Sequence, residues 1–326
     1  MDQHALLDTF KTGADRIDAL MRADLAAVES PLLSEVFQHA IFQGGKRIRP
    51  LLTVYSAGLL GEPPPTAPRL GMVFEYLHAA SLLHDDVIDH AELRRGKKTA
   101  NRRWGNAPVI LAGDYLHARA MDLAASIGGM ECLHLVSGAV KAMVEAEFLQ
   151  MRVAAEQDAS EEHYFAVLHG KTAALIGAAC EVGILHAGGN DKQRRALRTY
   201  GTHLGLAFQV VDDLLDYQGD PNRTGKAVGN DFQEGKMTLP LIYALQGLDK
   251  VLPPRLGELL AATPESRKQA IGEVQQGMEA AGAFTAARAT AERLISEAVA
   301  ALALFPKSEA RRILEGLAGY ALSRDK

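Results

Sequence analysis

The feature that most constrains the fold of this chain is its succession of long stretches rich in strong helix formers. Segments 109–125, 134–150, 162–187, 193–217, 237–247, 267–281 and 284–303 are rich in Ala, Leu, Glu, Gln and Met, which favour helix. Extended runs of alternating β-branched residues, which would indicate a sheet, are missing. Residues 61–65, 188–190, 219–222 and 253–254 contain Gly and Pro and predict short connections between helices. We therefore expect residues 1–326 to form a single all-α domain.

Composition excludes several protein classes. Hydrophobic residues make up 48% and charged residues 23% of the chain, as in ordinary globular proteins. Two cysteines, Cys132 and Cys180, cannot form a disulfide scaffold. The net charge of −5 argues against a nucleic-acid partner. The sequence shows neither a signal-peptide pattern nor, by inspection, an uninterrupted apolar run long enough to span a membrane. We expect a cytoplasmic protein with at most transient membrane contact.

Two copies of the pattern D-D-x-x-D follow apolar helical runs. The first copy consists of Asp85, Asp86 and Asp89, and the second of Asp212, Asp213 and Asp216. Three carboxylates within one helical turn repel one another, so such a cluster is typical of a cation site. Oxygen-only ligands suit Mg²⁺, which binds one or two carboxylates and completes its shell with water and substrate phosphate. The pattern therefore predicts magnesium and a phosphorylated substrate. The alternative, a solvated acidic helix face, is weakened by the second copy.

Basic residues are clustered as well. The cations between positions 94 and 103 are Arg94, Arg95, Lys97, Lys98, Arg102 and Arg103, and the segment from Gly44 to Pro50 adds Lys46, Arg47 and Arg49. Glycines allow a backbone to approach an anion closely, and Arg matches phosphate oxygens. We assign a binding role to Lys46, Arg49, Arg94 and Arg95, which adjoin turns near an acidic motif. Lys97, Lys98, Arg102 and Arg103 are interpreted as a solvated surface.

With these motifs in place, the sequence resembles the trans-isoprenyl diphosphate synthase (polyprenyl synthetase) family, in its medium- to long-chain branch. The resemblance extends from Gly44 to about Leu245. It is carried by Gly44-Gly45-Lys46-Arg47-Ile48-Arg49-Pro50, Leu82 to Asp89, Arg94-Arg95-Gly96, Gly113-Asp114-Tyr115-Leu116, Gly170-Lys171-Thr172, Phe208 to Asp216, Gly225-Lys226 and Gly235-Lys236. The family implies a single large helical bundle, the isoprenoid synthase fold, around a central hydrophobic tunnel.

The resemblance also implies roles for individual residues. Isopentenyl diphosphate is expected to be bound by Lys46, Arg49, His78 and Arg95. The allylic diphosphate is expected to be bound by Arg94, Lys171, Thr172, Gln209, Lys226 and Lys236. The six aspartates of the two motifs are expected to hold Mg²⁺, as three ions when diphosphate is bound. Catalysis is assigned to Asp85, Asp212, Lys171, Thr172 and Gln209.

The reaction implied is a step of isoprenoid biosynthesis, a magnesium-dependent, head-to-tail condensation of isopentenyl diphosphate with an allylic diphosphate. Departure of diphosphate leaves an allylic cation, and bound cations would stabilise the departing charge. This chemistry needs no protein nucleophile, and no Ser/His or Cys/His arrangement stands out in the sequence. The family further implies a homodimer, for which the helix at 109–125 could supply an interface.

Product length is expected to depend on the residues before the first acidic motif. Ala80 and Ser81, about one turn before Asp85, are small, while Leu77 and Phe74 lie further along the same helix, Phe74 at about 16 Å. We therefore expect an all-trans product longer than C20, in the octaprenyl range. The alternatives are a geranylgeranyl or farnesyl diphosphate synthase, a non-catalytic partner subunit of a heteromeric synthase, and a terpene cyclase.

Overall fold

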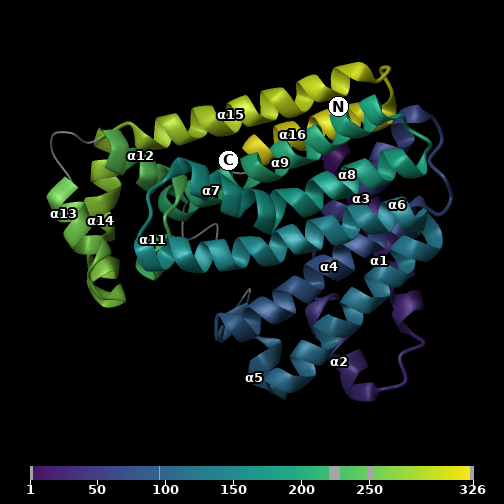
Figure 1. Cartoon of the computed structure of the whole chain (residues 1–326), viewed down its shortest axis with the longest axis horizontal. Coiled ribbons are helices and arrows are strands. Elements are labelled where there is room, and N and C mark those ends of the chain that lie inside the picture. Colours follow the sequence, from purple (N-terminus) through teal and green to yellow (C-terminus); the bar gives the residue numbers. More distant parts are fainter. Residues whose placement is uncertain (1–2, 95, 220–227, 248–252, 324–326) are drawn as a thin grey trace. The chain divides into compact units, whose positions relative to one another are not determined.

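The computed structural model describes residues 3–94, 96–219, 228–247 and 253–323, and these residues are overwhelmingly helical (Figure 1). The first helices are α1 (Gln3–Leu25), α2 (Pro31–Ala40), α3 (Ile48–Ala57), η1 (Gly58–Leu60), α4 (Ala67–Ile88), α5 (Ala100–Trp104) and α6 (Asn106–Glu156). They are followed by α7 (Glu161–Leu168), η2 (His169–Ala173), α8 (Ala174–His186), α9 (Asp191–Gln218), α11 (Asn230–Glu234) and α12 (Leu239–Gly247). The last are α13 (Pro253–Leu260), α14 (Pro264–Ala280), α15 (Ala283–Ala301), η3 (Leu302–Leu304) and α16 (Glu309–Leu322).

The all-α prediction is confirmed, with three differences of detail. Segments 109–125 and 134–150 lie in one element, α6, which is interrupted at Gly129 by a positive φ of 76°. Strands β1 (Leu93–Arg94) and β2 (Lys97–Lys98) form a short antiparallel hairpin. Residues 253–254, predicted as a connection, instead open α13, because proline is tolerated in the first turn of a helix. Of the predicted connection at 219–222, residues 220–222 lie outside the described part of the chain.

The chain divides into two compact units. The first unit contains residues up to 140 together with 178–198 and 304–316. In this unit α4 packs closely on α3. Gly71 permits the approach, since a Cβ atom there would lie 2.8 Å from the Pro50 carbonyl oxygen. The pairing holds α4, which carries the first acidic motif, against the segment that follows Gly44 and Gly45.

The second unit contains residues 141–177, 199–303 and the chain from 317 onward. In it α12 packs on α15 and α14, and α7 contacts α12. Gly205 of α9 allows a second close approach, because a Cβ atom there would lie 2.8 Å from the Cα atom of Ala173. This contact places α9, which carries the second acidic motif, directly against η2. Neither unit by itself tests the prediction of one domain, which stays a prediction.

Two helical stretches are long and apolar enough to cross a membrane by length and composition, although charged residues such as Glu131 and Glu181 interrupt their apolar runs. They are Asn106–Glu156 and Glu161–His186. The apolar window of the second is 61% buried, as in the core helix of a globular protein, whereas that of the first is 28% buried.

Candidate active site

The first acidic cluster, Asp85, Asp86 and Asp89, lies at the C-terminal end of α4 in the first unit. The helix ends at Ile88, and Asp89 is its C-cap, with its backbone N–H donating to the Asp85 carbonyl at 2.8 Å. Asp86 is 4% exposed, Asp85 is half-buried and Asp89 is exposed. Asp85 and Asp89 are therefore the two members of the cluster that are accessible to a ligand.

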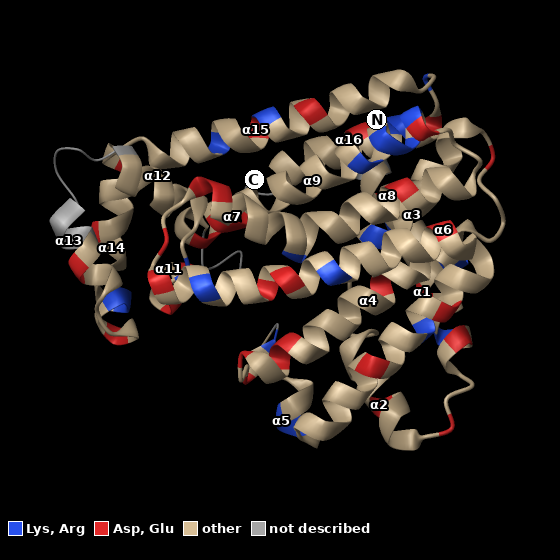
Figure 2. Cartoon of the chain, in the orientation of Figure 1, with Lys and Arg blue, Asp and Glu red and all other residues tan. Residues whose placement is uncertain are grey.

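Asp86 is occupied by contacts within the protein. The Nε and Nη2 atoms of Arg94 donate to its Oδ1 atom at 2.9 and 2.8 Å. The side chain of Asn101 donates to the Asp86 carbonyl oxygen at 2.9 Å. These contacts tie the hairpin and α5 to the end of α4, and the charged residues of α5 are basic (Figure 2). Asp86 and Arg94, which were predicted from the sequence to belong to one site, are in contact in the structure.

Arg47 has a structural role. It adopts a left-handed backbone conformation, with φ of 49°, and its guanidinium is buried. It donates to Asp18 at 2.5 Å, to Glu75 at 2.7 Å and to the Ile41 carbonyl at 2.6 Å. These three hydrogen bonds hold the guanidinium inside the protein, which agrees with the choice of Lys46 and Arg49 rather than Arg47 as binding residues.

The three described residues of the predicted isopentenyl diphosphate site lie in the first unit. Lys46 is exposed, while Arg49 and His78 are half-buried. The Nε atom of Arg49 is enclosed and has no hydrogen-bond partner among the described residues. Burial lowers the pKa of Arg49, although the charge of Glu75 acts in the opposite direction. A desolvated guanidinium with an unused donor suits an anionic ligand.

The predicted chain-length residues lie on α4. Phe74, Leu77 and Ala80 are buried, and Ser81 is half-buried with its hydroxyl donating to the His78 carbonyl at 2.9 Å. All four precede the first acidic cluster on the same helix, as the sequence indicated.

The second acidic cluster, Asp212, Asp213 and Asp216, lies on α9 in the second unit. Asp213 is 6% exposed and accepts a hydrogen bond from the Tyr164 hydroxyl at 2.7 Å. Burial, followed by the charges of Asp231 and Asp212, raises the pKa of Asp213 to about 8. Burial and the charge of Asp231 raise the pKa of Asp216 to about 6. Both shifts arise first from burial and second from nearby negative charge.

Asp231 is a member of this site that the sequence analysis missed. Its backbone N–H donates to Asp216 Oδ2 at 3.0 Å, and its own Oδ1 accepts from the Lys236 ammonium at 3.1 Å. Lys236 also pairs with Glu234 at 2.8 Å. Burial alone would lower the pKa of Lys236, but these acidic neighbours raise it above its usual value. The acid shortly before Gly235-Lys236 was the available signal in the sequence.

Lys171, Thr172 and Gln209 are also brought together in the second unit. Lys171 and Thr172 belong to η2, a π-helical turn, which is a frequent feature of functional sites. The Thr172 hydroxyl donates to Gln209 Oε1 at 3.4 Å. The Lys171 ammonium contacts Glu147 at 2.9 Å and Gln150 at 3.0 Å, two partners that the sequence did not reveal. Arg95 and Lys226, also predicted to bind diphosphate, lie outside the described residues.

The donor chemistry of both clusters fits a hard divalent cation. Within the described ranges, no group of three acidic, His or Cys side chains converges on one point as a closed metal site would require. Magnesium characteristically takes one or two carboxylates and completes its shell with water and phosphate oxygens. The charge of Asp231 contributes to the raised pKa values of Asp213 and Asp216, and a bound cation would relieve the repulsion among these carboxylates. The residues present therefore fit magnesium bound together with a phosphorylated ligand.

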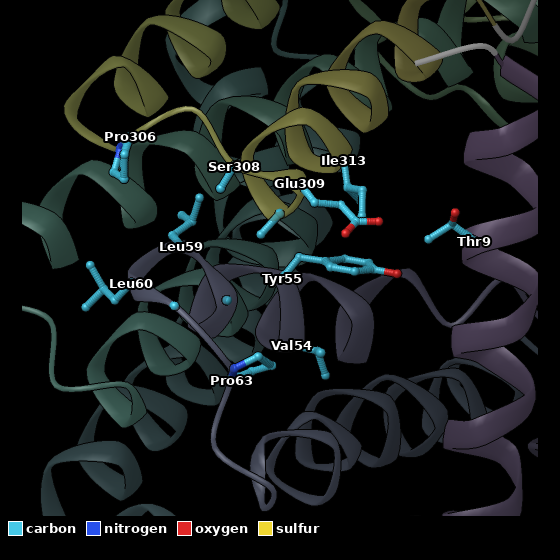
Figure 3. A pocket seen from close by; sticks show the side chains of 13 residues that line it. Thr9, Val54, Tyr55, Leu59, Leu60, Pro63, Pro306, Ser308, Glu309 and Ile313 are labelled. Carbon is cyan, nitrogen blue, oxygen red and sulfur yellow. The ribbon is translucent and has the colours of Figure 1, made fainter.

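A separate cavity of about 730 Å³ lies in the first unit and contains none of the predicted site residues (Figure 3). Tyr55, Leu59 and Pro63 line it on one side, and Glu309 and Ile313 of α16 line it on another. Its walls are mainly apolar and its distinct location argues against a role in diphosphate chemistry.

Comparison with known proteins agrees with these features. The profile of the polyprenyl synthetase family matches residues 30–278. The octaprenyl diphosphate synthase of Escherichia coli is 35% identical over 324 residues, covering 96% of this chain and 99% of that protein. The all-trans-nonaprenyl-diphosphate synthase (geranyl-diphosphate specific) of Rhodobacter capsulatus is 37% identical over 295 residues, covering 90% and 89%.

Solved structures give the same result. The polyprenyl synthase of Caulobacter crescentus, complexed with calcium and isoprenyl diphosphate, superposes with a TM-score of 0.87 at 36% identity, covering 100% of this chain and 98% of that one. A decaprenyl diphosphate synthase from Rhodobacter capsulatus superposes with a TM-score of 0.89 at 36% identity, covering both chains completely.

Proposed function

Since this chain belongs to the polyprenyl synthetase family and is a trans-prenyl diphosphate synthase, we propose that it makes an all-trans polyprenyl diphosphate longer than C20, in the octaprenyl range. It would do so by adding isopentenyl diphosphate head-to-tail to an allylic diphosphate. The observation that carries this proposal is the pair of oxygen-only acidic clusters, each with basic side chains beside it.

The acidic clusters are proposed to hold the allylic diphosphate through magnesium. Asp85 and Asp89 from the first cluster and Asp212 and Asp216 from the second are the more accessible carboxylates, whereas Asp86 and Asp213 are anchored within the protein. Bound magnesium, as three ions with the diphosphate, would supply positive charge to the leaving group. The proposal requires both clusters to reach the same diphosphate.

Basic and polar side chains complete the allylic site. Lys171 and Lys236 offer ammonium groups to the diphosphate, and we assign the same role to Arg94. Each has acidic partners within the protein, so each charge is held in place. Thr172 and Gln209, joined by a hydrogen bond, would lie beside the reacting carbons and orient them.

The second substrate is proposed to bind in the first unit. Arg49, with its enclosed and unpartnered Nε atom, would accept the diphosphate of isopentenyl diphosphate together with Lys46 and His78. The double bond of this substrate attacks the allylic cation, and the proton that is then lost passes to the released diphosphate. No protein nucleophile takes part.

The length of the product is proposed from two features. Ala80 is small and fully buried on α4 before the acidic cluster, which leaves Leu77 or Phe74 to limit chain growth deeper in the tunnel. The names of the relatives point the same way, since they include octaprenyl and nonaprenyl diphosphate synthases. A geranylgeranyl or farnesyl diphosphate synthase is the alternative.

Assembly and location belong to the same proposal. We propose one domain per chain, a cytoplasmic location and a homodimer. The large apolar side chains of Ile110, Leu111 and Tyr115 are exposed on α6, within the segment expected to form the interface. A second candidate is suggested by a Bacillus subtilis relative named heptaprenyl diphosphate synthase component 2, which is 31% identical over 309 residues. By that reading the chain would need a different subunit for activity.

One assay separates these possibilities. The purified chain is incubated with Mg²⁺, farnesyl diphosphate and labelled isopentenyl diphosphate, and the products are sized by chromatography. The proposal expects products longer than C20, in the octaprenyl range. A dominant C20 product contradicts the proposed product length. So does turnover that leaves most of the farnesyl diphosphate unextended. No consumption of isopentenyl diphosphate by the chain alone supports the two-subunit reading or a cyclase.

A further inference from the structure

A ring of hydrogen bonds joins three elements within the second unit. The Thr172 hydroxyl of η2 donates to the side chain of Gln209 on α9, and Gln209 in turn hydrogen-bonds to Asp213 one turn further on. The Tyr164 hydroxyl of α7 donates to Asp213 Oδ2 at 2.7 Å. Because α7 continues directly into η2, the path returns to Thr172. The acidic motif and the Lys171–Thr172 turn are thereby fixed to one another.

Two of the three hydrogen bonds of this ring, those from Gln209 and Tyr164, end on Asp213. The Tyr164 hydroxyl is the donor in its bond, and Asp213 Oδ2 is the acceptor. Both side chains are buried, where a lost partner is costly because water cannot replace it. Burial, followed by the charge of Asp213, raises the pKa of Tyr164 well above its ordinary value.

The position of Asp213 within its motif gives the bond a consequence for the site. Asp212 and Asp216 are half-buried on the same helix, while Asp213 faces the interior toward α7. Holding Asp213 therefore sets the rotation of α9, and this rotation decides where Asp212 and Asp216 point. A misplacement of about 1 Å at a reacting group can lower the rate about 100-fold.

We propose that Tyr164 is a positioning residue of the allylic diphosphate site: through Asp213 it fixes α9 relative to η2, so that Asp212, Asp216 and Lys171 address one diphosphate. This inference rests on the proposed function, because it takes the allylic diphosphate to bind at the second acidic cluster.

The test uses Tyr164→Phe, which removes one oxygen atom and keeps the packed ring. Tyr243→Phe is the matched control in the same unit. The Tyr243 hydroxyl also donates to a carboxylate of α7, Glu161, at 3.0 Å, and shares a hydrogen bond with Thr290 at 3.0 Å, but it touches no residue of the acidic motif in the described contacts. Both variants thus lose a hydroxyl bound to a carboxylate.

Three quantities are measured for each variant: the Kd of inorganic diphosphate with Mg²⁺ by calorimetry, the separate KM values for the two substrates, and the unfolding temperature. For Tyr164→Phe we expect the diphosphate Kd and the allylic KM to rise about tenfold, with the isopentenyl diphosphate KM within about twofold. Tyr243→Phe should leave the diphosphate Kd and both KM values within about twofold, even if its unfolding temperature falls as much as that of Tyr164→Phe.

Coupling supplies a second readout. If Tyr164 acts through Asp213, Tyr164→Phe weakens diphosphate binding much less in the Asp213→Asn background than in the wild-type background. The reason is that the effects of coupled residues are not additive. Equal effects of Tyr164→Phe and Tyr243→Phe, an equal rise in both KM values, or full additivity would overturn the inference. Failure of the wild-type protein to bind diphosphate with Mg²⁺ or to consume isopentenyl diphosphate would instead overturn the proposed function itself, and the inference with it.

Discussion

Replacing Ala80 by Tyr is expected to shorten the product, because Ala80 is proposed to face the tunnel. Ala80 is fully buried on α4 and lies five residues before Asp85, about 7.5 Å along the helix axis. A phenol ring at this position would close the path of the growing chain well before Phe74, which lies about 16 Å from Asp85. Elongation from geranyl diphosphate should then stop at C15 or C20.

The cost in stability separates a tunnel from a packed core. If Ala80 faces open space, the ring fills that space and the free energy of unfolding changes little. If Ala80 packs against other side chains, the added atoms overpack the core and cost about 1–3 kcal/mol or more. Ala79→Tyr is the matched control, since Ala79 is also buried but points about 100° away around the helix. It should destabilise the protein without shortening the product.

The assay combines product sizing with denaturant unfolding of the wild type and both variants. The reasoning is supported by a shorter product from Ala80→Tyr at nearly unchanged stability. It is refuted if Ala80→Tyr lowers the free energy of unfolding as Ala79→Tyr does and yet leaves the product length of the surviving activity unchanged.

Three further predictions concern charge. Metal-free protein should lose stability as pH rises from about 4 to 8, by up to about 1.4 kcal/mol per pH unit. The reason is that Asp213, with its pKa raised to about 8, keeps a proton that the unfolded chain has released. When unfolding is measured across this range in EDTA, the Asp213→Asn variant should lack that part of the slope. Arg47→Ala should cost about 3–5 kcal/mol in denaturant unfolding, since it leaves buried Glu75 without its partner, whereas the exposed Arg102→Ala should cost at most about 1 kcal/mol; equal losses would contradict the assignment of Arg47. Arg49→Gln should raise the KM of isopentenyl diphosphate about 10- to 100-fold in steady-state kinetics while the allylic KM stays the same, and a rise confined to the allylic KM would reverse the assignment.

Local patterns were sufficient to predict most of the helices and several of the site contacts. The helix formers around Asp212 predict α9, and the proximity of Asp86 to Arg94 follows from eight residues of separation across a turn. The break in α6 at Gly129 is consistent with predicting separate helices on its two sides.

Contacts between distant segments could not be predicted in this way. Tyr164 meets Asp213 across 49 residues, and Arg47 meets Glu75 across 28. Nothing in the neighbourhood of either residue announces its partner, because such contacts depend on how helices pack. The same limit explains why Asp231 was missed, since its significance comes from folding back onto Asp216.

The central claim is that two acidic clusters, distant in sequence, serve one diphosphate. The most direct measurement is a crystal structure of the protein with Mn²⁺ in place of Mg²⁺ and a non-reactive allylic thiolodiphosphate, with the metals located by anomalous scattering. We predict metal ions that join the diphosphate oxygens to Asp85 and Asp89 and also to Asp212. A diphosphate bound at one cluster alone, with no metal at the other, would contradict the claim.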